Sequence, residues 1–123
     1  MNIRIRDARI GDLVGLAHVA KTSYEDAFGQ YFSDKESLEI ETRERRSKRY
    51  FESVLGKDHI LVAEIDGKIV GYLQFGEPSS DIEQVSFEDM QFRRLYILTT
   101  FHNRGIGSKL IVGHDDVMVK KLN

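Results

Sequence analysis

Two glycines stand where the sequence predicts that a helix begins. They are Gly105 and Gly107 in the segment "LYILTTFHNRGIGSKL" (95–110), in which an apolar run leads through a polar turn into a helical pattern. Glycine inside a helix costs about 1 kcal/mol relative to alanine, so the pair indicates that something approaches the bare backbone. The first amides of a helix lack partners within it and lie at its positive dipole end. The spacing therefore predicts a cradle for a phosphate or another anion.

Two well-known phosphate-binding patterns do not fit this segment. The P-loop pattern G-x-x-x-x-G-K-[ST] is absent from it. The dinucleotide pattern G-x-G-x-x-G fails because Leu110 stands where the third glycine belongs. It also comes too late in the chain to be followed by a second nucleotide-binding half.

In the first half of the chain, the sequence predicts a strand and two helices among the elements that position the turn. Apolar residues alternate with arginines over 2–8, which predicts a half-buried strand. Apolar residues at helical spacing over 13–28 predict a helix with Asp12 as its N-cap. A second helix is predicted from Ser33, in an S-x-x-E capping box, to about residue 55. Its charge run is interpreted as a solvated helix surface.

The second half of the chain is richer in strands. Asp66-Gly67 separates two β-branched runs and predicts a tight hairpin between strands at 59–65 and 68–75. A polar loop with its only proline follows, and an irregular strand turn is expected near Val85 and Phe87. A fourth strand at 91–98 then leads through the glycine turn into a last helix at about 105–121. The order β-α-α-β-β-β-α indicates a single α/β or α+β domain over residues 1–123.

Composition excludes several classes of protein. The net charge is −2, which gives no basic face for nucleic acid. No apolar run has the length of a membrane span, and the N-terminus lacks the apolar centre of a signal peptide. The chain has no cysteine, which removes disulfides, thiolate metal sites and thiol catalysis. A cytoplasmic enzyme or binding domain is therefore expected, with no membrane, nucleic-acid or metal partner.

The residues His102-Asn103-Arg104-Gly105-Ile106-Gly107 resemble the acetyl-CoA-binding motif [Q/R]-x-x-G-x-[G/A] of the GNAT superfamily of N-acetyltransferases. "IRIRDARIGDLVGL" is similar to the family's first strand and helix start, and "ILVAEIDGKIVGYLQF" to its second and third strands. His102 departs from the motif, which has Gln or Arg there. The resemblance implies a GNAT-like mixed sheet and an acetyl-CoA-dependent transferase acting on a primary amine of a small molecule or peptide.

The resemblance also implies which residues contact acetyl-CoA. Backbone amides of the turn would hold the pyrophosphate, and the fourth strand would align the pantetheine arm as if it were an added strand. The amide of Ile97 would face the thioester oxygen and stabilise its developing charge. The full set of expected cofactor contacts is Leu95, Tyr96, Ile97, His102, Asn103, Arg104, Gly105, Ile106, Gly107 and Ser108.

The attacking amine must lose a proton, which calls for a carboxylate. Glu83 and Glu88, in an acidic segment that also carries Glu77, Asp81 and Asp89, are the candidate general bases. The alternative is that this segment is simply a solvated loop. Three aromatic residues near the first inter-helix turn are candidates for lining the acceptor site, with core packing as the alternative. They are Tyr24, Phe28 and Tyr31.

The family's further strand, helix and final hairpin have no counterpart after the last predicted helix. That region usually supplies a tyrosine that protonates the leaving thiolate. Its absence leaves a second hypothesis, a non-catalytic CoA-binding or oligomerisation module, and predicts a homodimer or larger assembly with residues 92–98 or 107–123 at the contact. A metal-dependent hydrolase built on His114, Asp115 and Asp116 is a third reading, which fails because successive helical side chains diverge.

Overall fold

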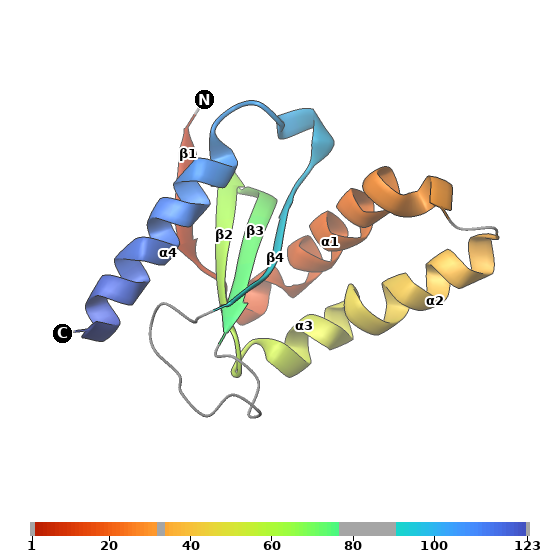
Figure 1. Ribbon diagram of the computed structural model, residues 1–123, viewed down its shortest axis with the longest axis horizontal. Coiled ribbons are helices and arrows are strands. Elements are labelled where there is room, and N and C mark those ends of the chain that lie inside the picture. The colour runs from red at the N-terminus through yellow and green to blue at the C-terminus, as the bar shows by residue number, and fades with distance from the viewer. Residues whose placement is uncertain (1, 32–33, 77–90, 123) are drawn as a thin grey trace.

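A four-stranded sheet lies between helices on its two faces in the computed structural model, which describes residues 2–31, 34–76 and 91–122 (Figure 1). The strands are β1 (Ile3–Asp7), β2 (His59–Ile65), β3 (Lys68–Gly76) and β4 (Gln91–Ile97). The helices are α1 (Leu13–Phe28), α2 (Lys35–Arg45), α3 (Lys48–Val54) and α4 (Ile106–Leu122). The α/β fold predicted from the sequence is confirmed.

The sheet has the order β1-β2-β3-β4, and every neighbouring pair of these strands is antiparallel. The parallel pairing that a mixed sheet contains is therefore not found among the described strands. Asp66 (φ 51°) and Gly67 (φ 80°) form the β2–β3 turn, as their positive φ preference predicts. The order leaves β4 at one edge of the described sheet, with the glycine turn directly after it.

Each face of the sheet has its own core. On one face, Leu16, Phe51 and Tyr72 belong to a cluster formed by α1, α3, β2 and β3. On the other, Leu73, Ile106 and Leu110 belong to a cluster formed by the sheet and α4. The alternation of side chains along β3 sends Tyr72 to the first core and Leu73 to the second. The sheet therefore fixes α1 and α4 relative to each other through its two packed faces.

The predicted helix over 33–55 is wrong in its continuity, because the structure breaks it into α2 and α3. Arg46 leaves the helical region (φ −135°), and the Ser47 side chain accepts a hydrogen bond from the Tyr50 amide at 3.1 Å to cap α3. Asp34 caps α2 by accepting from the Ser37 amide at 2.7 Å. Ser33, the predicted cap, lies outside the described residues.

Asp12 precedes α1 as predicted, but its carboxylate does not cap that helix. It accepts from the Arg9 amide at 2.7 Å and from Arg6 Nη1 and Nη2 at 2.8 and 2.9 Å. Arg6 Nε also donates to Glu64 Oε2 at 2.8 Å. The side chain of Arg6 is 15% exposed and that of Asp12 is 11% exposed. One mostly buried cation thus joins β1, β2 and the approach to α1.

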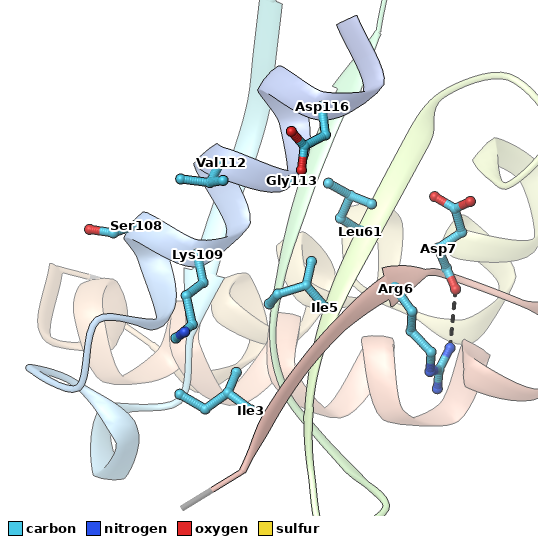
Figure 2. A pocket seen from close by; sticks show the side chains of 10 residues that line it. All are labelled: Ile3, Ile5, Arg6, Asp7, Leu61, Ser108, Lys109, Val112, Gly113 and Asp116. Atoms are coloured by element: carbon cyan, nitrogen blue, oxygen red, sulfur yellow. Dashed lines mark hydrogen bonds between the residues drawn. The ribbon is translucent and has the colours of Figure 1, made fainter. Parts of the chain in front are cut away.

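Gly113 lets α4 approach the sheet closely (Figure 2). A Cβ atom at this position would lie 3.1 Å from Ile5 Cγ2 and 3.2 Å from Leu61 Cδ1, tighter than ordinary contacts. Beside this contact, Ile3, Ile5 and Leu61 face α4 across an open pocket of about 570 Å³. No helix in the described ranges has the length and apolar character that crossing a membrane requires.

Candidate cofactor site at the glycine turn

The turn between β4 and α4 has a backbone that depends on glycine. A short 3-10 turn, Thr99–Phe101, follows β4, and Asn103 (φ 63°) and Gly105 (φ 77°) then adopt the left-handed conformation. The Lys109 amide donates to the Gly105 carbonyl at 3.1 Å, the bond that starts the intrahelical pattern of α4. The amides of Ile106, Gly107 and Ser108 precede that bond and lie at the positive end of the helix dipole. This is the arrangement that binds an anion.

The end of β4 presents backbone groups to the free edge of the described sheet. The Leu98 amide donates to the Val70 carbonyl of β3 at 2.9 Å. Because backbone groups of successive strand residues point to opposite sides, those of Ile97 and Leu95 point away from β3. Tyr96 differs from its neighbours: its backbone faces β3, opposite Tyr72. Among the three predicted residues of β4, only Leu95 and Ile97 thus offer free-edge groups to a ligand.

His102 is tied to β4. Its Nε2 atom donates a hydrogen bond of 2.8 Å to the Ile97 carbonyl, although the side chain lies at an exposed position. The sequence predicted that His102 contacts the cofactor. Its contact with the backbone of β4 was not predicted. It occupies the Ile97 carbonyl and leaves the Ile97 amide available at the same edge. The imidazole therefore holds the turn against the strand that precedes it.

A pocket of about 1020 Å³ opens beside the turn. Leu98, Phe101 and Arg104 line it from the turn, Val14 and His18 line it from α1, and the β2–β3 hairpin closes one end. The Arg104 guanidinium carbon lies 5.5 Å from the centre of the Phe101 ring. Thr99 Oγ1 donates to Asp26 Oδ2 of α1 at 2.9 Å and ties the turn to that helix. The part of the turn before Gly105 therefore borders a space larger than a phosphate, while residues 105–108 do not line it.

The predicted acceptor-site aromatics do not share one environment. The rings of Tyr24 and Phe28 lie 5.1 Å apart, centre to centre, at the C-terminal half of α1. Phe28 is 42% exposed, and Tyr31, in a 3-10 turn after α1, is 74% exposed. Tyr24 is partly buried beneath the Arg46 guanidinium, whose carbon lies 3.6 Å from the ring centre. Only Tyr24 is thereby brought close to β4.

Arg46 connects Tyr24 to β4, a role that was not predicted from the sequence. The residue is 6% exposed, so the interpretation of its charge run as a solvated surface is wrong at this position. Its Nη2 atom donates to the Tyr96 hydroxyl at 3.4 Å. No local pattern marks it, because a buried arginine and a solvated one look alike within a charged helix. Arg46 and Tyr96 place a cation and a hydroxyl beside the edge strand.

Tyr72 lies beneath Tyr96, with ring centres 5.8 Å apart. Burial raises the pKa of the Tyr72 hydroxyl well above its usual range. The residue is fully buried, so this hydroxyl stays protonated at neutral pH and does not exchange a proton with a ligand. Its ring packs against that of Tyr96 from the core.

The remaining candidates are separate from the turn. Glu83 and Glu88, the predicted general bases, lie outside the described residues. On α4, His114 is buried and packs against Phe75 of β3, with ring centres 4.6 Å apart. Asp115 and Asp116 are exposed. Within the described ranges, no group of three or more His, Cys, Asp or Glu side chains is placed to hold a metal ion.

The sequence and fold match known N-acetyltransferases. Residues 56–118, just over half of the chain, match the family model of the acetyltransferase (GNAT) domain. The chain therefore belongs to the GNAT acetyltransferase family. An uncharacterised N-acetyltransferase of Archaeoglobus fulgidus is 36% identical over 76 residues, covering 57% of this chain and 48% of that protein. An uncharacterised N-acetyltransferase of Lactobacillus delbrueckii subsp. lactis is 23% identical over 100 residues, covering 80% of this chain and 58% of the relative.

Solved structures share the fold. The PaiA N-acetyltransferase of Thermoplasma acidophilum, solved with coenzyme A, has a TM-score of 0.82 at 24% identity and covers 98% of this chain and 74% of that one. A GNAT family acetyltransferase of Brucella melitensis, solved with acetyl-CoA, has a TM-score of 0.66 at 19% identity, with 98% and 70% coverage. The chain spans about half the length of the curated relatives it matches.

Proposed function

We propose that this chain binds acetyl-CoA and transfers its acetyl group to a primary amine of a small molecule or peptide. The observation that carries the proposal is the glycine turn, which follows β4, an edge strand of the described sheet, and leads into the amides of Ile106, Gly107 and Ser108 at the start of α4. A Cβ atom at Gly105 would meet no atom within 4 Å, so the turn is open to a ligand at that point. Membership of the GNAT family and the coenzyme complexes of its neighbours support it.

Acetyl-CoA would supply the acetyl thioester. The turn amides of Asn103 to Ser108 would hold its phosphates, and Arg104 would add a fixed positive charge beside them. The edge groups of Leu95 and Ile97 would orient the pantetheine arm in the manner of an added strand. The Ile97 amide, left available by the bond between His102 and the Ile97 carbonyl, would donate to the thioester oxygen as negative charge develops on it.

The acceptor would approach from the side of α1. The amine nitrogen would attack the thioester carbonyl carbon and lose a proton to a carboxylate. The carbon–sulfur bond would break, and coenzyme A would leave as its thiolate, which takes up a proton from solvent. Glu83 or Glu88 is the proposed base. Tyr24, Phe28 and Tyr31 are the proposed acceptor contacts, and Tyr24 is supported by the contact of its neighbour Arg46 with Tyr96 on β4. Release of free thiol on mixing the protein with acetyl-CoA and a panel of amines tests the reaction directly.

Coenzyme A is expected to stabilise the fold against heat much more than pantetheine, which lacks the phosphates. Ligand stabilisation follows RT ln(1 + [L]/Kd), so about 2.7 kcal/mol is expected at a hundredfold excess over Kd. Thermal unfolding followed by circular dichroism with each ligand at equal concentration measures the difference. Equal shifts of Tm with the two ligands would place the affinity in the pantetheine contacts and remove the phosphate role of the turn.

Self-association stays a prediction. The edge position of β4 in the described sheet and the 40% exposure of Leu95 support an assembly with residues 92–98 or 107–123 at the contact. A contact at 92–98 would compete with acetyl-CoA for the edge groups of Leu95 and Ile97, whereas one at 107–123 would leave them accessible. Light scattering at micromolar concentration is expected to give at least twice the 14.2 kDa mass of one chain. A mass of one chain at all concentrations would contradict it.

A further inference from the structure

A groove of about 530 Å³ lies between α1 and α2, apart from the glycine turn. His18 and Lys21 line it from α1, and Glu39, Thr42, Arg43 and Arg46 line it from α2 and its C-terminal cap. Val14 and His18 line both this groove and the pocket beside the turn, but none of the residues proposed above to contact the cofactor or the acceptor lines the groove. It therefore calls for an explanation of its own.

The groove concentrates positive charge. Lys21, Arg43 and Arg46 face a single carboxylate, that of Glu39, so its lining carries a formal charge of +2 with His18 neutral. The whole chain, by contrast, carries a net charge of −2. A hollow lined by one sign of charge raises the local concentration of ions of the opposite sign. The expected ligand is an anion.

Thr42 adds an unused hydrogen-bond donor to the wall of the groove. The residue is 6% exposed, and within the described part of the chain its Oγ1 atom has no hydrogen-bond partner. A threonine inside a helix commonly donates to the carbonyl four residues earlier, which this one does not do. Burial of an unpaired hydroxyl destabilises the fold unless a ligand satisfies it. The hydroxyl thus points independently to a ligand with acceptor oxygens.

Arg46 is held in place for such a ligand. Its guanidinium stacks over the Tyr24 ring at 3.6 Å, and its Nη2 atom reaches the Tyr96 hydroxyl at 3.4 Å. These contacts fix the plane of the guanidinium and reduce the conformational entropy that binding would otherwise cost. A planar guanidinium with several N–H donors suits an oxyanion better than a monatomic anion.

We propose that this groove is a binding site for an oxyanion, either a phosphate or a carboxylate group. Arg43 and Lys21 supply charge at its rim, Arg46 supplies oriented N–H donors, and the Thr42 hydroxyl donates from the buried wall. The site is distinct from the glycine turn and does not depend on acetyl transfer. Arg46 also contacts the side-chain hydroxyl of Tyr96, the residue that precedes Ile97 on β4.

The test is a titration of isotope-labelled protein with inorganic phosphate and, separately, with succinate, each against sodium chloride at equal ionic strength. Backbone amide shifts in NMR spectra locate the binding. We expect shifts at residues 18–21 and 39–47 that saturate with at least one of the two anions. Arg43→Gln is expected to weaken this binding at least fivefold. Arg49→Gln, which removes an exposed charge from α3 outside the groove, is the matched control and should stay within twofold.

Thr42→Val separates a ligand role from a structural one. Without anion it is expected to raise Tm, because an unpaired buried hydroxyl is removed, and with anion it is expected to weaken binding. A hydroxyl with only a structural role would leave the affinity unchanged. Gly107→Val is expected to abolish phosphate-induced shifts at 103–108 and to leave those of the groove intact. Shifts confined to 103–108 with both anions, or equal losses in Arg43→Gln and Arg49→Gln, would overturn the proposal.

Discussion

Gly105→Val and Gly107→Val are each expected to weaken the binding of acetyl-CoA at least tenfold, for different physical reasons. Gly105 has φ +77°, which β-branched side chains adopt only with strain, so valine would distort the turn. At Gly107 the conformation is ordinary and a Cβ atom would lie 3.4 Å from Ile97 Cδ1, an ordinary van der Waals contact, so only a side chain that extends beyond Cβ crowds Ile97. The branches of valine would press on Ile97, whose amide is the proposed donor to the thioester oxygen. Isothermal calorimetry measures both affinities.

Alanine variants distinguish the two reasons. Gly105→Ala is expected to retain most of the defect, since any L-residue is strained at this φ, whereas Gly107→Ala should be mild. Gly56→Val is the matched control, because Gly56 is exposed, has no positive φ and has open space around its Cα. Unchanged affinity in folded valine variants would remove the turn from the cofactor site.

Arg6→Gln is expected to lower the free energy of unfolding by about 3 kcal/mol, because it leaves two largely buried carboxylates without their cation. The Arg6 guanidinium bonds both oxygens of Asp12 and one of Glu64, whose side chain is 20% exposed. Arg4→Gln is the control on the same strand: Arg4 is exposed, and its loss should cost less than about 0.5 kcal/mol. Urea unfolding at neutral pH measures both, and equal losses would contradict the role given to Arg6.

The contribution of the Arg6–Asp12 contact to the free energy of unfolding depends on pH. Hydrogen bonding to Arg6 lowers the pKa of the Asp12 carboxyl below its ordinary value of 3.8. Its contribution to stability is thus complete above that value and is lost as the pH falls through the lowered pKa. The stability difference between the wild type and Arg6→Gln should be constant near neutrality and narrow below about pH 4. A difference that stays constant in acid would show that ionised Asp12 is not the source of the stability difference.

Local patterns predicted the strands well because each signal lies within the strand itself. The Asp66-Gly67 turn fixes where β2 ends and β3 begins, and the prediction of 59–65 and 68–75 differs from the structure by one residue at the end of β3. The glycine turn could be predicted for the same reason, because the positive φ at Gly105 is a conformation that glycine itself favours. Elements set by their own residues were within reach of the sequence.

What the sequence did not predict is set by contacts between distant segments. The break between α2 and α3 accompanies the burial of Arg46 against Tyr24 of α1 and Tyr96 of β4, so three separate elements meet at this arginine. The bond from His102 to the Ile97 carbonyl likewise requires the turn to fold back on its strand. Neither contact has a periodic signature. A charged residue in a charged helix and a histidine in a polar turn both appear unremarkable until the chain is folded.

The close packing of Gly113 against Ile5 and Leu61 has a consequence at the N-terminus of α4. Gly113 lies seven residues from Ile106, about 10 Å along the helix axis. A larger residue at 113 would lift the helix from the sheet by a few tenths of an ångström, and a rigid helix would carry that displacement to its first amides. A screen for variants with lost ligand affinity should therefore recover position 113. Such a variant would look like a ligand-contact mutation, although its side chain faces the sheet.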